Sequence, residues 1–267
     1  MDRRRVYSAL VFFPCFYILV RYLPPGAFFA FVAIGILLAQ YEYYRLYFAK
    51  RWTSGIGLGL GLGVFVSAAF AVPGLVTVPA IATVTVGALV LERLLIERDL
   101  KTGLLDTAVL VFGVFYIAWL VGHMILIRQF EEGSLLIFFL FLVTWANDVA
   151  AYYTGTFLGR HAMAPEISPK KTWEGAVGGL LGSIAAAFAC RALFLESLRP
   201  LDALWLGLLL GVAGPLGDLC ESALKRSAGV KDSGTLIPGH GGILDRIDSL
   251  IFASPAFYYY LLAMRTP

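Results

Sequence analysis

The residues with the clearest chemical potential lie in the segment GDLCESALKRSAGVKDSGTLIPGHGGILDRIDS, residues 217–249. Asp218 is followed at offsets of three, four and seven by Glu221, Ser222 and Lys225. These offsets place all four side chains on one face of a helix. Because hard divalent cations bind oxygen ligands, the carboxylates of Asp218 and Glu221 could hold one. The spacing therefore predicts a metal site on this helix face.

The second half of the same segment adds a glycine-rich turn and more charge. In the sequence PGHGG, residues 238–242, the glycines would let the backbone approach a phosphate closely. His240 has three open roles: a base, a phosphate donor or a structural residue of the turn. We expect Asp245 to complete the metal site opposite Asp218. Further candidates for contact with a polyanionic substrate are Arg226, Lys231, Asp232, Arg246 and Asp248.

Phosphoryl and nucleotidyl transfer use this combination of groups. Magnesium takes oxygen ligands, keeps several waters and bridges phosphate oxygens, while fixed cations balance the charge that develops on the leaving group. The alternative is a solvated polar loop between two membrane spans. Such a loop would not be expected to combine its charges with a Pro-Gly-His-Gly-Gly turn, so nucleotidyl or phosphoryl transfer is the favoured interpretation.

A second polar cluster lies upstream, in residues 145–175. Asp148 falls inside an apolar run, where an ionised carboxylate costs at least about 2.5 kcal/mol unless it is paired or bound to a cation. We expect it to face a polar cavity and contact substrate; the alternative is a structural hydrogen bond. Ser168, Lys170 and Lys171 precede a glycine-rich helical segment, an arrangement that suits a phosphate at a helix N-terminus. The paired lysines could instead anchor a cytoplasmic loop.

The elements that position these groups are predicted to be membrane-spanning helices. The chain has 267 residues, of which 59% are hydrophobic and 15% charged, and its mean hydropathy is +0.80, which excludes an ordinary soluble domain. Runs of about 20 apolar residues are typical of spanning helices, and an all-α polytopic bundle of about nine spans follows. The expected spans are residues 6–22, 26–43, 56–73, 75–92, 106–126, 134–154, 176–195, 202–222 and 247–264.

Charge asymmetry predicts the orientation of this bundle. Most of the 21 Lys and Arg residues fall on the side of the N-terminus and the long polar loops. Because cytoplasmic loops are enriched in Lys and Arg, we expect the N-terminus and the site to face the cytoplasm and the C-terminus to lie outside, in the inner (plasma) membrane. We expect residues 1–130 to form a scaffold or dimerisation part and residues 131–267 the catalytic part.

Two features of the first half have competing interpretations. The glycine-rich stretch of residues 55–63 could be a phosphate cradle, but it lacks suitably placed Lys, Ser or Thr, so close helix packing is favoured. Glu42 lies in the aromatic run of residues 41–48, which is typical of an interfacial belt. We interpret Glu42 as a surface acid; a site residue facing the bundle is the alternative.

The polar motifs resemble a known family. SALKRSAGVKDSGTLIPGHGGILDRID, residues 222–248, is similar to the signature of the phosphatidate cytidylyltransferases, with its SxxKR, KD, PxHGG and DRxD elements in order. SPKKTWEG, residues 168–175, and the intramembrane Asp148 also resemble that family. The strong similarity begins near Trp145, whereas the first half agrees only in being apolar helices of suitable length.

The resemblance implies a dimeric membrane enzyme that transfers CMP from CTP to phosphatidic acid. It implies Mg²⁺, joined by a monovalent cation such as K⁺, held by Asp218 and Asp245. It also implies that Lys170, Lys171, Lys225, Arg226, Lys231 and Arg246 contact phosphates. We expect membrane lipid and no nucleic acid as a partner. Rival hypotheses are a cytidylyltransferase for another lipid phosphate, a polyprenol-type kinase, or a transporter. The transporter is disfavoured because the polar motifs concentrate in the second half.

Overall fold

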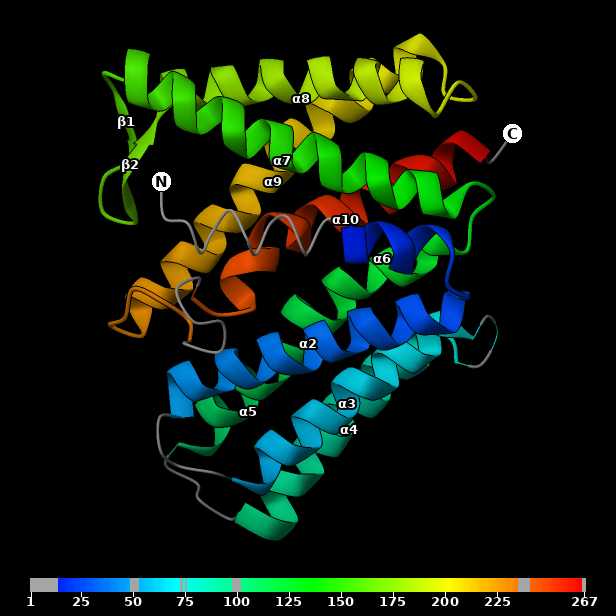
Figure 1. The fold of residues 1–267 in the computed structure, drawn as a ribbon. Coiled ribbons are helices and arrows are strands. Elements are labelled where there is room, and N and C mark those ends of the chain that lie inside the picture. Colours follow the sequence, from blue (N-terminus) through cyan, green and yellow to red (C-terminus); the bar gives the residue numbers. More distant parts are fainter. Residues whose placement is uncertain are drawn as a thin grey trace. The chain divides into compact units, whose positions relative to one another are not determined.

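The computed structural model describes residues 14–48, 53–72, 74, 76–97, 102–234 and 241–265. Within these ranges, eight helical segments are long and apolar enough to cross a membrane, which confirms the prediction of an all-α membrane bundle (Figure 1). The segments are α2 (Pro25–Phe48), α3 (Ser54–Ala71), α4 with the π-helix η1 (Val78–Glu92, Arg93–Glu97), α5 with the π-helix η2 and α6 (Gly103–Gly113, Val114–Trp119, Leu120–Arg128), α7 (Gly133–Leu158), α8 (Trp173–Leu193), α9 (Pro200–Ser227) and α10 (Leu244–Arg265).

Eight of the nine expected spans thus have a counterpart, with ends that differ by a few residues. The remaining one, residues 6–22, lies largely outside the described residues; of it, residues 14–21 are helical. Apolar run length decides the existence of a spanning helix, whereas its ends depend on local caps and loops.

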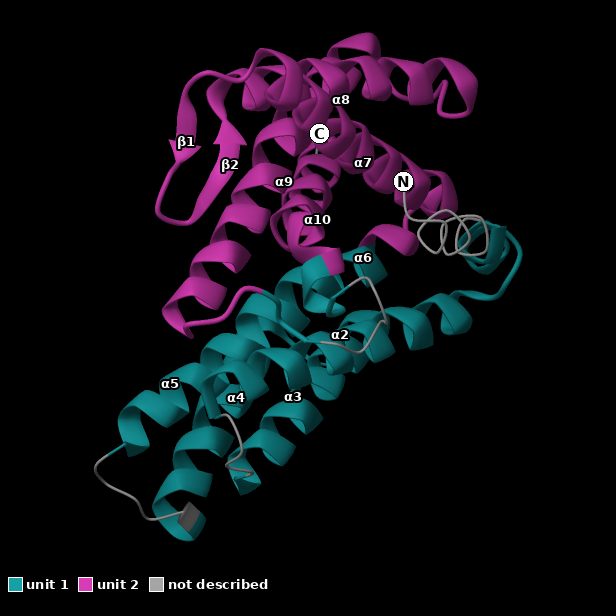
Figure 2. Cartoon of the chain, turned by 60° about the vertical axis from the view of Figure 1, so that its left-hand side comes forward, with its two compact units in different colours: residues 1–126, 232–245 teal, residues 127–231, 246–267 magenta. Residues whose placement is uncertain are grey.

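The chain forms two compact units (Figure 2). The first contains residues 1–126 and 232–245, and the second contains residues 127–231 and 246–267. The division at residue 126 lies near the expected boundary at residue 130. Residues 232–245, however, belong to the first unit, although they follow the second unit's α9 in sequence.

In the first unit, α2 and α3 meet through glycines. A β-carbon added at Gly59 would lie 2.6 Å from the Tyr44 hydroxyl, and one added at Gly63 would collide with the Gln40 amide. The Gln40 Nε2 donates to the Tyr44 hydroxyl and to the Gly59 carbonyl, each at 2.8 Å, and Tyr44 donates to the carbonyl of Leu110. The packing interpretation of the glycine stretch is confirmed. Tyr44 is fully buried, so its assignment to an interfacial belt was wrong.

In the second unit, α7, α8 and α9 pack through small residues, and α7 and α8 run side by side (Figure 1). A β-carbon at Gly175 would lie 2.9 Å from the Ala151 carbonyl oxygen, and one at Gly179 would lie 3.0 Å from the Ala151 β-carbon. Where lipid surrounds a bundle, such small residues let helix backbones approach closely. This contact fixes α7, which carries Asp148, against α8.

A short antiparallel hairpin joins α7 to α8, where the sequence suggested only a polar loop. Strand β1 (Ala162–Ala164) pairs with β2 (Ser168–Thr172). The Thr172 hydroxyl caps α8 by accepting from the Gly175 N–H at 3.1 Å. The Glu174 carboxylate accepts from the backbone N–H groups of Arg160 and His161. The hairpin is therefore tied to the first turn of α8.

Candidate active site

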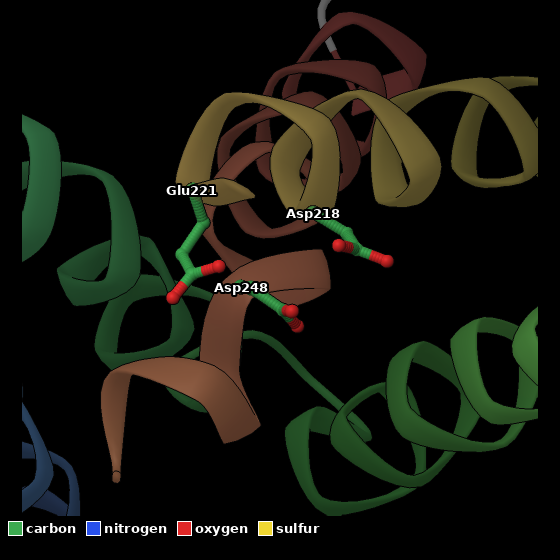
Figure 3. Close-up of side chains that lie close together, drawn as sticks. All are labelled: Asp218, Glu221 and Asp248. Atoms are coloured by element: carbon green, nitrogen blue, oxygen red, sulfur yellow. The ribbon is translucent and has the colours of Figure 1, made fainter. Parts of the chain in front are cut away.

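Three carboxylates of the second unit converge. Asp218 and Glu221 extend from α9, and Asp248 extends from α10 (Figure 3). One oxygen of each lies within 4.8 Å of the others. Glu221 is fully buried, whereas Asp218 and Asp248 are partly accessible. The expected proximity of Asp218 and Glu221 is present. Asp248, expected to contact substrate, is the third member.

A glycine lets the two helices bring these acids together. Gly217 precedes Asp218 on α9, and a β-carbon added there would collide with the backbone carbonyl oxygen of Asp248. Any other residue at position 217 would therefore push α9 and α10 apart. The close approach of the acids depends on this missing side chain.

Two lysines balance part of the negative charge. The Nζ atom of Lys171 lies 2.7 Å from Asp218 Oδ2, and that of Lys225 lies 2.7 Å from Glu221 Oε2. The Ser222 hydroxyl donates to Asp218 Oδ1 at 3.3 Å. Successive residues of a strand point to opposite faces, so β2 directs Lys171 to the acids while Lys170 is exposed. Of the paired lysines, the structure brings only Lys171 to the carboxylates.

Asp148 takes part in the same electrostatic cluster. Its accessible carboxylate interacts with the charges of Asp218 and Lys171 and forms a hydrogen bond with the side chain of Ser249. Asp248 likewise interacts with Asp218, Asp148 and Lys171. These interactions place Asp148 beside polar and charged groups of the second unit, and the polar cavity expected around it stays a prediction. Its proposed contact with substrate stays a prediction.

The neighbouring Asn147 supplies a hydrogen bond that α9 lacks because of a proline. Pro215 lies inside α9 and has no N–H to donate to the carbonyl of Gly211, four residues earlier. The Asn147 Nδ2 donates to that carbonyl at 3.1 Å, and its side chain is buried. Asn147 thereby connects α7 to α9 at Gly211, seven residues before Asp218.

Asp245 belongs to the other compact unit. Its Oδ2 accepts from the Ser233 N–H at 3.1 Å, from the Ser233 hydroxyl at 2.8 Å and from the Gly242 N–H at 2.8 Å. Its pairing with Asp218 as a metal ligand stays a prediction. His240 lies outside the described residues.

The remaining candidates belong to the hairpin, to the last turn of α9, to the residues that follow it and to the first turn of α10. Arg226 donates from Nε to the Ile167 carbonyl and from Nη1 to the Val230 carbonyl, which fastens the hairpin loop to the end of α9. Ser168 opens β2 and is half-buried. Exposed side chains belong to Lys231, Asp232 and Arg246. Their proposed contacts with phosphate or substrate stay predictions.

Glu42 is the residue that sequence reasoning misplaced. Only 2% of it is exposed, so the interpretation as a surface acid was wrong. Its carboxylate accepts from the backbone N–H groups of Ile243 and Leu244. Those groups lie about 200 residues further along the chain, and no local pattern around Glu42 indicated them. The only available signal was a charged residue inside an apolar helix.

A family model for the cytidylyltransferase family matches residues 3–264. The chain belongs to the cytidylyltransferase family. An uncharacterized relative, YnbB from Escherichia coli K12, is 46% identical over 151 residues, covering 57% of this chain and 50% of the relative. The phosphatidate cytidylyltransferase of Brucella suis is 44% identical over 153 residues, 55% of each chain. That of Bacillus subtilis is 41% identical over 160 residues, 60% of this chain and 59% of the relative.

The chain spans only about half the length of the Escherichia coli and Brucella suis relatives that it matches. The family match extends through both compact units, including the first half, where sequence motifs were weakest. It accounts for the presence of polar groups suited to nucleotide chemistry inside an apolar bundle.

The acid cluster also fits a bound metal ion. Around a six-coordinate Mg²⁺, ligand oxygens lie about 2.1 Å from the ion, so opposite ligands are about 4.2 Å apart. Carboxylate oxygens within 4.8 Å of one another are close to that requirement. All three donors are hard oxygen ligands, the type that magnesium selects. Asp218, Glu221 and Asp248 are thus the residues that would hold such an ion.

Proposed function

We propose that this protein is a magnesium-dependent phosphatidate cytidylyltransferase, which converts CTP and phosphatidic acid to CDP-diacylglycerol and pyrophosphate. The observation that carries the proposal is the convergence of Asp218, Glu221 and Asp248 in a chain of the cytidylyltransferase family. Relatives with the name phosphatidate cytidylyltransferase support the choice of lipid.

The proposed reaction requires no protein nucleophile. A phosphate oxygen of phosphatidic acid attacks the α-phosphorus of CTP, forming one P–O bond, while the bond from that phosphorus to the β-phosphate bridging oxygen breaks. The electron pair leaves on pyrophosphate. The lipid phosphate is already anionic at neutral pH, so the task of the protein is to bring two polyanions together and to stabilise charge in the transition state.

The residues of the site divide this work. Bound magnesium would withdraw electron density from the phosphate oxygens and stabilise the negative charge that develops on the departing pyrophosphate. Lys171 and Lys225 neutralise the acids when substrate is absent, and their ammonium groups then become available to phosphate oxygens as the nucleotide arrives. Asp148, whose carboxylate interacts with Lys171, would orient that ammonium group toward the lipid phosphate.

The setting of the reaction is part of the proposal. The enzyme would lie in the inner (plasma) membrane, with its site open to the cytoplasm, where CTP is made, and to the lipid layer, where phosphatidic acid resides. The Lys and Arg asymmetry supports this orientation. We propose a homodimer and a monovalent cation such as K⁺ as further partners.

A product assay tests the proposal. Purified protein in phosphatidic acid micelles is given α-labelled CTP and MgCl₂, and labelled lipid and pyrophosphate are measured together. We expect equal amounts of CDP-diacylglycerol and pyrophosphate, and no turnover with EDTA. Release of CDP with a phosphorylated lipid would identify a kinase instead. A different lipid phosphate as the preferred acceptor would refute the assignment to phosphatidic acid.

A further inference from the structure

We propose that Glu42 is a positioning residue, which clamps Ser233 to the first turn of α10 and so fixes the position of Asp245, the residue that the sequence predicts as a metal ligand for the nucleotide. The inference rests on the proposed function for its kinetic part. The clamp itself is a structural statement about the first compact unit and can be tested without any activity.

The Glu42 carboxylate collects three donors from residues distant in sequence. Its Oε2 accepts from the Leu244 N–H at 2.9 Å and from the Ser233 hydroxyl at 3.2 Å. Its Oε1 accepts from the Ile243 N–H at 3.1 Å. Since Glu42 is almost completely buried, each of these donors replaces water that the carboxylate has lost.

These contacts make Glu42 a helix cap supplied from another helix. The first N–H groups of a helix have no partner within it, and a negative charge there interacts favourably with the helix dipole. α10 begins at Leu244, whose N–H points to Glu42. The carboxylate therefore fixes where α10 starts, and with it the position of Asp245 in the first turn.

Asp245 forms the second half of the clamp. Its Oδ2 accepts from the N–H and hydroxyl of Ser233 and from the N–H of Gly242. The Ser233 hydroxyl thus lies between two carboxylates, from Glu42 and Asp245. Ser233 is therefore held by both acids, and Gly242 is held by Asp245.

The glycines around the clamp are an independent indication of its tight fit. A β-carbon at Gly234 would lie 2.7 Å from Glu42 Oε1, and one at Gly242 would collide with Glu42 Oε2. Both positions therefore exclude larger residues because the Glu42 carboxylate occupies the space. A buried acid with only a general packing role would not need backbone this close on two sides.

The first experiment measures the clamp directly. Hydrogen exchange of the Gly242, Ile243 and Leu244 amides is compared in wild-type protein, in Glu42→Gln and in Glu196→Gln. Glu196 is exposed in the α8–α9 connection and serves as the matched control. We expect exchange to accelerate at least about tenfold in Glu42→Gln only, since an amide side chain cannot accept from every donor. Unchanged exchange at these amides would overturn the clamp.

The second experiment tests its consequence for catalysis. In Glu42→Gln we expect the KM for CTP to rise at least about fivefold, while the KM for phosphatidic acid stays within about twofold of wild type. A purely structural role would reduce the amount of active enzyme and leave both KM values unchanged, which would refute the positioning role. Glu42→Asp, which keeps the charge on a shorter side chain, should recover part of the loss.

The two parts of the inference can fail separately. If wild-type protein turns over no CTP with phosphatidic acid, the proposed function fails, while the exchange result still decides whether the clamp exists. If turnover is present and Glu42→Gln changes neither exchange nor the KM for CTP, only the clamp fails.

Discussion

At the scale of single residues, the main feature of the site is an excess of acidic over basic side chains. One carboxylate oxygen from each of Asp218, Glu221 and Asp248 lies within 4.8 Å of the others. The carboxylate of Asp148 interacts with the charges of Asp218 and Asp248. Lys171 forms an ion pair with Asp218, and Lys225 forms one with Glu221. Four acids and two lysines leave an excess of negative charge. Burying like charges together is costly unless a cation joins them. Asp218, Glu221 and Asp248 could hold a metal ion that offsets this charge, as the proposed function requires.

This balance predicts the effect of neutralising Asp218. In Asp218→Asn, the shape is kept but one anionic ligand is lost and Lys171 loses its ion-pair partner, so we expect turnover to fall at least about a hundredfold. CTP turnover and the unfolding temperature in detergent are measured together, with Glu196→Gln as the control acid. Turnover within twofold of wild type would eliminate Asp218 as a metal ligand.

At the scale of elements, the contact between α9 and α10 sets the geometry of the acids. Gly217→Ala would drive a β-carbon into the Asp248 carbonyl, and overpacking of this kind costs about 1–3 kcal/mol. We expect lower stability and loss of activity, because Asp218 and Asp248 separate. Gly214→Ala is the matched control on the same helix: its β-carbon would meet Ser249 at an ordinary 3.8 Å. Equal behaviour of the two variants would contradict a requirement for close approach.

The contact between α7 and α9 gives a second prediction at this scale. Asn147→Ala leaves the Gly211 carbonyl without a donor and should destabilise the protein by about 1–2 kcal/mol. In a Pro215→Ala background, the new N–H can donate to Gly211 within the helix. The cost of Asn147→Ala should then largely disappear. Unfolding of both single variants and the double variant measures this coupling; additive losses would show that Asn147 does not compensate for Pro215.

Sequence could predict most of the elements but only part of the site. Runs of apolar residues identified eight described spans, and the helical offset between Asp218 and Glu221 correctly predicted their proximity. Both signals are local. Glu42 was misinterpreted because its partners come from residues 233–244, and the hairpin was missed because three- and five-residue strands give too little periodicity. Contacts distant in sequence were beyond a pattern-based prediction.

At the scale of the whole molecule, the remaining question is which loops face the cytoplasm. α8 has 21 residues, so it is roughly 32 Å long at 1.5 Å per residue, enough to cross about 30 Å of hydrocarbon. The exposed Glu166, in the hairpin before α8, and Glu196, after it, should therefore lie on opposite sides of the membrane. Charge asymmetry predicts Glu166 on the cytoplasmic side.

Matched cysteine variants test this orientation. Glu166→Cys and Glu196→Cys are placed in a background that lacks Cys15, Cys190 and Cys220, the three native cysteines, all of which are free. An impermeant thiol reagent applied to intact spheroplasts should label Glu196→Cys and should label Glu166→Cys only after lysis. Labelling of Glu166→Cys from outside would invert the topology. The hairpin that brings Lys171 to the acids would then lie on the side without CTP, and the proposed reaction could not take place there.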